Sequence, residues 1–182
     1  MRKLLLVVIL LAACSSAPPA ASPSSPPPPA STPPAATPPA VTPPAGADWR
    51  VLAEDLWLGE APFAVQAALN AEQLATLWAA LGRNGDLPEV DFDREAVLFL
   101  GMAGSSSCPE QLTGLVVDHA NGRVYGEWSR QVPPGAACTD DLRGQGLLIA
   151  VPTEVLPEGR FLLSLRQERI CPECPDQVLV ER

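Results

Sequence analysis

The chain has 182 residues, a formal net charge of −9 and 47% hydrophobic side chains, which suits one globular domain. Its only lysine is Lys3 and its only histidine is His119, so the chain beyond its first residues cannot hold a Schiff-base lysine, a Walker-type phosphate loop or a histidine-rich metal site. The acidic balance makes nucleic acid and anionic lipid surfaces poor partners.

Residues 1–13 have the layout of a secretory signal. Arg2 and Lys3 precede an apolar run, residues 4–11, that is too short to span a bilayer. The run ends in Leu-Ala-Ala-Cys14, which resembles the lipobox of bacterial lipoprotein signal peptides, where cleavage precedes a cysteine that becomes lipid-modified. We therefore expect a lipoprotein of the cell envelope, anchored through acyl chains on Cys14 and facing the periplasm or the extracellular space. An ordinary signal peptide followed by a stray cysteine is the alternative.

Residues 14–46 predict a lipidated cysteine followed by a disordered tether. Of the 22 prolines in the chain, 13 lie within residues 15–46, and the rest of that segment is almost wholly Ala, Ser and Thr. Such a composition cannot bury enough apolar surface to fold. In a polyproline II conformation the tether would reach on the order of 100 Å. A docking role for the prolines is the alternative.

Residues 47–182 predict a single α+β domain, mostly β, with antiparallel sheets and one packed helix. Strands are expected in chain order at residues 49–58, 63–69, 96–101, 112–118, 122–128, 147–151, 160–166 and 178–180. The alanines within residues 63–69 leave the type of that element open. The runs 96–101 and 147–151 are apolar on both faces, which favours central strands. The Asn-Gly pair at Asn121 favours a tight hairpin turn between the fourth and fifth strands, and the alternation in residues 160–166 favours an antiparallel sheet.

The helix has clear signals at both of its ends. Asn70 is a candidate N-cap with Gln73 three residues later, Leu74 and Leu77 begin an apolar stripe at helical spacing, and Gly82 follows as a stop. We expect this helix to pack on the sheet.

Four cysteines remain after Cys14, and an even number in an exported chain favours disulfides. We favour Cys108 with Cys138, because both lie in loops at the ends of successive predicted strands, which leaves Cys171 with Cys174. The Cys-Pro-Glu-Cys sequence could instead cycle between dithiol and disulfide. It lacks the strand-to-helix context of redox motifs, and Pro175 follows it, so a stapled turn between two short strands is the preferred interpretation. A zinc site made of all four thiols is the third alternative.

The other polar clusters do not predict catalysis. The serines at 105–107 lack a base, because His119 lies beside the predicted hairpin tip. The alternating acids Glu89, Asp91, Asp93 and Glu95 lack the glycine of a calcium loop and are interpreted as a solvated strand entry. Asp140 and Asp141 are interpreted as loop solvation. We predict no catalytic residue, cofactor or bound metal.

The order of features within residues 61–165 is similar to the C-terminal domain family of the protease complex subunit PrcB. The features are the capped helix with Leu77-Trp78, the sequence Leu-Pro-Glu-Val-Asp-Phe at 87–92, the apolar strand ending at Gly101, the hairpin and the late strand at 146–152. The resemblance implies an exported protein that associates with a surface protease and does not itself cut peptides. The segment with Cys108 and the Cys171–Cys174 tail depart from the family pattern.

We therefore expect a lipid-anchored, extracytoplasmic module that binds a protein partner in the cell envelope, as a non-catalytic subunit of an envelope protease. The alternatives are a thiol-disulfide redox protein that uses Cys171 and Cys174, and a small-ligand-binding lipoprotein with a pocket between sheet and helix.

Overall fold

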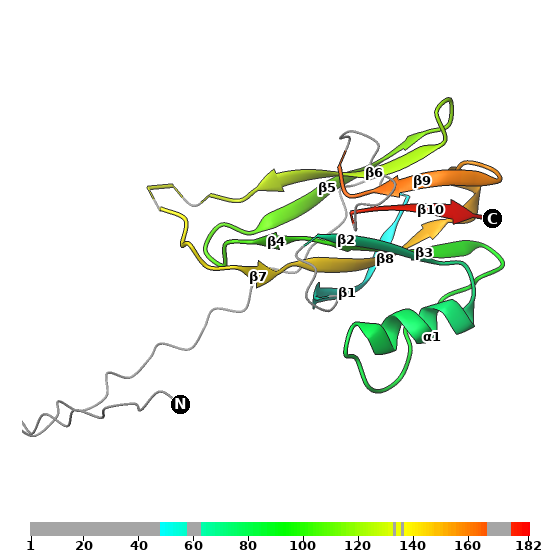
Figure 1. The fold of residues 1–182 in the computed structure, drawn as a ribbon, viewed down its shortest axis with the longest axis horizontal. Coiled ribbons are helices and arrows are strands. Elements are labelled where there is room, and N and C mark those ends of the chain that lie inside the picture. Colours follow the sequence, from blue (N-terminus) through cyan, green and yellow to red (C-terminus); the bar gives the residue numbers. More distant parts are fainter. Residues whose placement is uncertain (1–47, 58–62, 133, 136, 167–175) are drawn as a thin grey trace, which may run out of the picture. The chain divides into compact units, whose positions relative to one another are not determined.

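A computed structural model describes residues 48–57, 63–132, 134–135, 137–166 and 176–182. The described part is mostly β with one helix, as the sequence predicts (Figure 1). No described helix has the length and apolar character needed to cross a membrane. The predicted signal segment, the tether and the Cys171–Cys174 turn lie outside the described residues.

The first sheet has four antiparallel strands in the order β1-β8-β3-β2. Their bounds are Arg50–Leu56 for β1, Ala64–Ala68 for β2, Glu95–Gly101 for β3 and Gly146–Pro152 for β8. The two apolar runs of the sequence thus lie side by side in the middle of this sheet, where the prediction placed them. They are central because nearly every side chain in them is apolar and can be buried on either face.

The second sheet has the order β10-β9-β6-β5. Its strands are Glu110–Asp118 for β5, Arg123–Arg130 for β6, Arg160–Ser164 for β9 and Gln177–Glu181 for β10. The predicted hairpin is present as the β5–β6 pair, and Gly122 at its turn has a φ of 58°, which favours glycine. Strand β9 is antiparallel to β10 but parallel to β6, so this sheet is mixed where an antiparallel one was expected.

Three short elements are absent from the sequence-based prediction. Strands β4 (Ala103–Gly104) and β7 (Arg143–Gly144) pair with each other, and a 3-10 turn, η1, covers Thr153–Val155. None is long enough to show a hydrophobic period.

The first sheet is buried on both faces, between the helix and the second sheet. On β3, Ala96, Leu98 and Leu100 join a core shared with the second sheet, whereas Val97 and Phe99 join a core under the helix. The partner strand β8 divides in the same way, with Ile149 toward one core and Leu148 toward the other. This alternation follows from the two-residue period of a strand and produces the three layers (Figure 1).

Helix α1 spans Ala71–Ala80 and lies along β2 (Figure 1). The Asn70 side chain accepts a hydrogen bond from the Gln73 N–H at 2.9 Å, and the Gln73 side chain accepts one from the Leu69 N–H at 2.7 Å. The first bond satisfies a main-chain donor that a helix start leaves open, and the second ties the first turn to the residue before the cap. Leu74 and Leu77 are buried against the sheet, and Gly82, at a φ of 68°, follows the last turn. The predicted helix is confirmed.

Replacing Asn70 by Ala should lower the free energy of unfolding by about 1 kcal/mol, because the side-chain acceptor at the helix start is lost. The matched control is Asn84→Ala, since Asn84 is exposed in the loop after the helix. Urea unfolding of both variants measures the difference. Equal losses in the two variants would contradict the assigned capping role.

Candidate functional site

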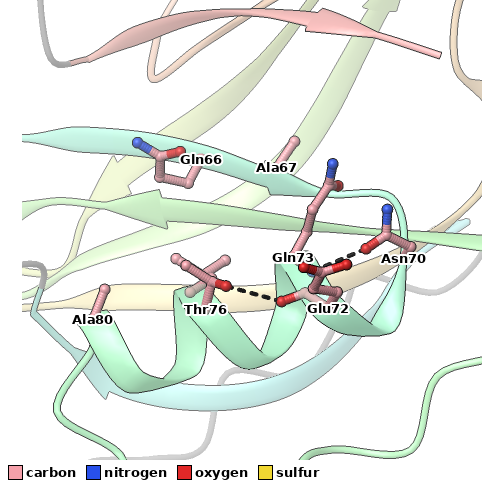
Figure 2. Close-up of a pocket in the computed structure, with 8 residues that line it drawn as sticks. Gln66, Ala67, Asn70, Glu72, Gln73, Thr76 and Ala80 are labelled. Atoms are coloured by element: carbon pink, nitrogen blue, oxygen red, sulfur yellow. Dashed lines mark hydrogen bonds between the residues drawn. The ribbon is translucent and has the colours of Figure 1, made fainter.

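An open groove of ≈ 640 Å³ lies between β2 and α1. Figure 2 shows its lining side chains, which come from two consecutive elements of the chain. The strand contributes Gln66 and Ala67, and the helix contributes Asn70, Glu72, Gln73, Thr76, Leu77 and Ala80. The volume lies within the range of ordinary binding sites, and the groove is open to solvent.

Local hydrogen bonds fix the polar rim of the groove. The cap described above holds Asn70 and Gln73 in place, and the Thr76 hydroxyl donates to the Glu72 carbonyl oxygen at 3.0 Å (Figure 2). The buried Leu77 and the exposed Ala80 supply the apolar surface of the helix. The groove therefore joins a narrow apolar strip to a polar edge.

A second hollow of ≈ 450 Å³ shares Asn70 and Gln73 with the groove and also lies against Leu69. Its other lining residues come from the strand entries and the C-terminus, namely Phe92, Asp93, Glu95, Ala96, Thr153, Glu181 and Arg182. Carboxylates predominate among its charged groups. The Arg182 guanidinium donates to the carbonyl oxygens of Leu156 and Pro157, each at 3.1 Å.

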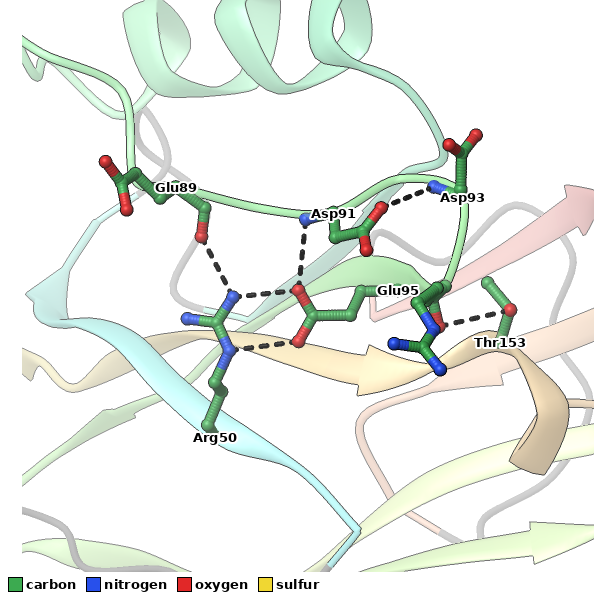
Figure 3. A network of polar contacts seen from close by, with 7 residues as sticks. Arg50, Glu89, Asp91, Asp93, Glu95 and Thr153 are labelled. Carbon is green, nitrogen blue, oxygen red and sulfur yellow. Dashed lines mark hydrogen bonds and ion pairs between the residues drawn. The ribbon is translucent and has the colours of Figure 1, made fainter.

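The acidic segment before β3 is organised by one arginine, as Figure 3 shows. Arg50 on β1 forms a two-pronged pair with Glu95, at 2.8 and 3.0 Å, and donates to the Glu89 carbonyl oxygen at 2.9 Å. The hydrogen bond from Arg50 holds the pKa of Glu95 below its ordinary value, and the same pairing raises the pKa of Arg50.

These acids serve the fold locally. Besides the pairing of Glu95, the Asp91 carboxylate accepts the Asp93 N–H at 3.2 Å, as at an Asx turn. The segment is an entry into β3, which is how the sequence was interpreted. Among the described residues, no three His, Cys, Asp or Glu side chains gather closely enough to hold a metal ion.

The predicted pairing of Cys108 with Cys138 is present as a disulfide. Cys108 is completely buried beside the start of β5. The bond ties the loop of Ser105–Ser107, called the serine loop below, to the segment before β7. Hydroxyl groups add contacts between the two segments: the Ser107 hydroxyl accepts the Thr139 N–H at 2.8 Å, and the Ser105 and Thr139 hydroxyls lie 2.9 Å apart.

The serine loop and His119 are not brought together. The loop precedes β5, whereas His119 is exposed at the tip of the β5–β6 hairpin, after the far end of that strand. Asp141 joins the serine loop instead, since its carboxylate accepts the Ser106 N–H at 3.1 Å and the Thr139 hydroxyl. Hydrogen bonding from Ser106 and Thr139 lowers the pKa of Asp141 to about 2. Asp141 thus organises the loop, a role beyond the solvation that the sequence predicted.

The other predicted site residues, Cys14, Cys171 and Cys174, lie outside the described residues. The strands that flank the Cys-x-x-Cys sequence, β9 and β10, are antiparallel neighbours, and the Leu165 N–H donates to the Asp176 carbonyl oxygen at 2.9 Å.

Sequence reasoning missed the residues of the groove. It raised a pocket between sheet and helix but named no lining residue. The available signal was the very short connection from the strand at 63–69 to the helix cap, which lets the helix fold back along its own strand.

Converting both Cys108 and Cys138 to Ala should lower the free energy of unfolding by about 3 to 4 kcal/mol in the chain-entropy model, because the bond spans 30 residues. Denaturant unfolding of the double variant and of the wild type, both without reductant, measures this. A Cys171→Ala, Cys174→Ala double variant is the control, and it should lose less because the loop it could close is much shorter. A loss at Cys108 and Cys138 no larger than in the control would contradict the assignment.

The depressed pKa of Asp141 predicts acid sensitivity. Because the folded-state pKa, about 2, lies below the value of about 3.9 in an unfolded chain, the carboxylate stabilises the fold above pH 4 and loses this effect as the pH falls toward 2. The Asp141→Asn variant should show a shallower loss of stability between pH 4 and pH 2. The carboxyl carbon shift of Asp141, followed by NMR, gives the pKa directly. A midpoint near the ordinary value would contradict the described contacts.

Comparison with family models, with curated proteins and with solved structures gave no match to this chain. The site is therefore characterised by its own geometry.

Proposed function

We propose that this protein is a lipid-anchored, extracytoplasmic binding module that recruits a protein partner in the cell envelope, as a non-catalytic subunit of an envelope protease assembly. The observation that best supports a binding role is the groove between β2 and α1. It is a surface bordered by a sheet edge, and its polar lining residues Gln66, Glu72 and Thr76 are exposed.

The location is supported by sequence features. The Leu-Ala-Ala-Cys14 motif supports lipid attachment, and the proline-rich stretch that follows supports a spacer between membrane and domain. The disulfide between Cys108 and Cys138 agrees with an oxidising compartment. The link to a protease rests on the family resemblance in residues 61–165.

Replacing Cys14 by Ser should release the protein from the membrane fraction, because each buried methylene of an acyl chain contributes about 0.8 kcal/mol to membrane binding. Labelling with a radioactive fatty acid and fractionation of the envelope measure this. A Ser15→Ala variant is the control and should stay in the membrane. A Cys14→Ser protein that keeps both label and location would contradict the anchor.

The binding role is tested with the full-length protein tagged at Arg182. The tagged protein is crosslinked in cells and solubilised in detergent, and the species joined to it are identified. A single partner at fixed stoichiometry, present also in a Cys171→Ser, Cys174→Ser double variant, is the expected result. Species that form only through mixed disulfides and vanish in the double variant would replace the proposal with thiol-disulfide chemistry. Recovery of the protein without any crosslinked species would contradict a binding role.

A further inference from the structure

Strand β2 has an unpaired main-chain edge beside the groove. Among the residues that the structure describes, the strand is the last of the first sheet and pairs with β3 alone. Within the described part of the chain, no main-chain hydrogen bond outside this pairing involves Ala64–Ala68. An edge of this kind presents N–H and C=O groups on alternate residues and is a template for a further strand.

The groove meets that strand at Gln66 and Ala67. In Figure 2 the side chain of Ala67 points away from α1, and it packs with the core between the sheets. Ala67 nevertheless lines the groove, so the strand borders the groove with main-chain atoms at this residue. The α1 side chains form the opposite wall. A strand edge faced by a helix can hold an extended peptide, with main-chain bonds on one side and side-chain pockets on the other.

Two other sheet edges, those of β1 and β5, are less suited to strand addition. The pairing of β1 with β8 shifts register twice, at Val51/Ala53 and at Ala53/Leu56, and β5 has a shift at Leu112/Gly114. Such irregularities interrupt the row of main-chain groups that a partner strand needs. The register of β2 on β3 is continuous over all five residues, as is that of the edge strand β10 on β9. What distinguishes β2 is that helix α1 lies alongside it.

The charge near the groove indicates the side chains of the occupant. Glu72 is the only charged residue that lines the groove, and it forms no salt bridge among the described residues. Asp93 and Glu181, in the adjoining hollow, also form no described salt bridge, and Arg182 there is held by carbonyl oxygens. A basic side chain on the occupant would therefore find unpaired carboxylates.

The helix wall sets the size of the other side chains. Thr76 and Ala80 are small and lie one helical turn apart on the groove face. They leave room for small or medium apolar side chains on alternate residues of an extended chain. Leu77 provides the apolar contact between them.

We propose that the groove between β2 and α1 binds an extended segment of the partner protein, which adds to the first sheet as a strand beside β2 and places a basic side chain near Glu72. This inference rests on the proposed function, because it specifies how the partner is held.

The first test uses short peptides selected from a random displayed library on the full-length protein and then synthesised with blocked ends. Ala80→Arg, which fills the groove, should weaken binding at least about tenfold, and Ala79→Arg should change it less than about twofold. Ala79 is the matched control because it is equally exposed on α1 but does not line the groove. Equal effects of the two variants would overturn the inference.

The second test examines the main-chain bonds. Only alternate residues of an added strand direct their N–H groups toward β2. Methylating the nitrogens of the peptide residues whose N–H groups point toward β2 should weaken binding by about two- to tenfold for each bond removed. Methylating the nitrogens of the residues between them should leave binding nearly unchanged. Amide hydrogen exchange within Ala64–Ala68 should slow at the outward-facing residues when the peptide is bound. Strand addition beside β2 would be overturned if neither set of methylated peptides lost affinity. It would also be overturned if the peptide bound against another strand.

The third test examines charge. Replacing the basic residue of a selected peptide by norleucine should weaken its binding to the wild type by up to about fivefold and should have no effect on a Glu72→Gln variant. Glu154→Gln, at an exposed glutamate of η1, is the control and should retain the wild-type preference. Equal losses in wild type and Glu72→Gln would overturn the assigned basic contact.

The groove and the proposed function can fail separately. If the partner found by crosslinking is retained by Ala80→Arg, the binding role stands and the groove inference is wrong. If selected peptides bind in the groove as described but no envelope partner is crosslinked, the groove stands as a peptide site and the proposed function is wrong. A chain that dimerises through β2, detected by sedimentation and lost in Ala80→Arg, would also overturn the inference, because a second copy would be the occupant.

Discussion

The burial of β3 and β8 on both faces is the constraint on which the rest of the domain depends. Their apolar side chains enter two separate cores, so the helix and the second sheet are both held by the same pair of strands. Each fully buried large apolar side chain contributes roughly 1.5–3 kcal/mol, which makes this pair the main source of stability. The fit is close at Phe99. A Cβ added at Gly146 would lie 2.6 Å from the Leu56 carbonyl oxygen and 2.8 Å from the Phe99 ring, and one at Gly101 would lie 2.7 Å from that ring. The two glycines thus leave the space that the phenyl ring fills.

Most of the architecture can be predicted from the sequence, because its signals are local. The apolar runs at residues 96–101 and 147–151 indicate central strands, Asn70 with Gln73 indicates a helix start, and the Asn-Gly turn indicates a hairpin. The parallel pairing of β6 with β9 could not be predicted, since it joins segments separated by the whole of β8 and depends on how the sheets pack. Strands β4 and β7 have two residues each, so they carry no period to detect.

The candidate site, like the fold, could be predicted from the sequence only in part. The pairing of Cys108 with Cys138 follows from loop positions that the sequence indicates. The groove could not be predicted from the sequence, although its two walls, β2 and α1, are consecutive in the chain. Whether β2 is an edge strand depends on which strand takes the other side of β3, and that place belongs to β8, some fifty residues beyond β3 in the sequence. The role of Asp141 likewise depends on contacts across more than thirty residues, from Ser106. The acids near β3 were interpreted correctly because their partners, apart from Arg50, lie within the same segment.

The strand order of the first sheet has a mechanical consequence. The chain enters the described domain next to β1, at one edge of the sheet, whereas the unpaired edge of β2 is at the other. A tension applied between the segment before β1 and a strand held at β2 would cross the full width of the sheet, and would be borne by the hydrogen-bond ladders on either side of β3 and β8. The central β3–β8 ladder is the most deeply buried of them, so a load on this line would pass through the core of the domain and leave the β5–β6 hairpin unstressed.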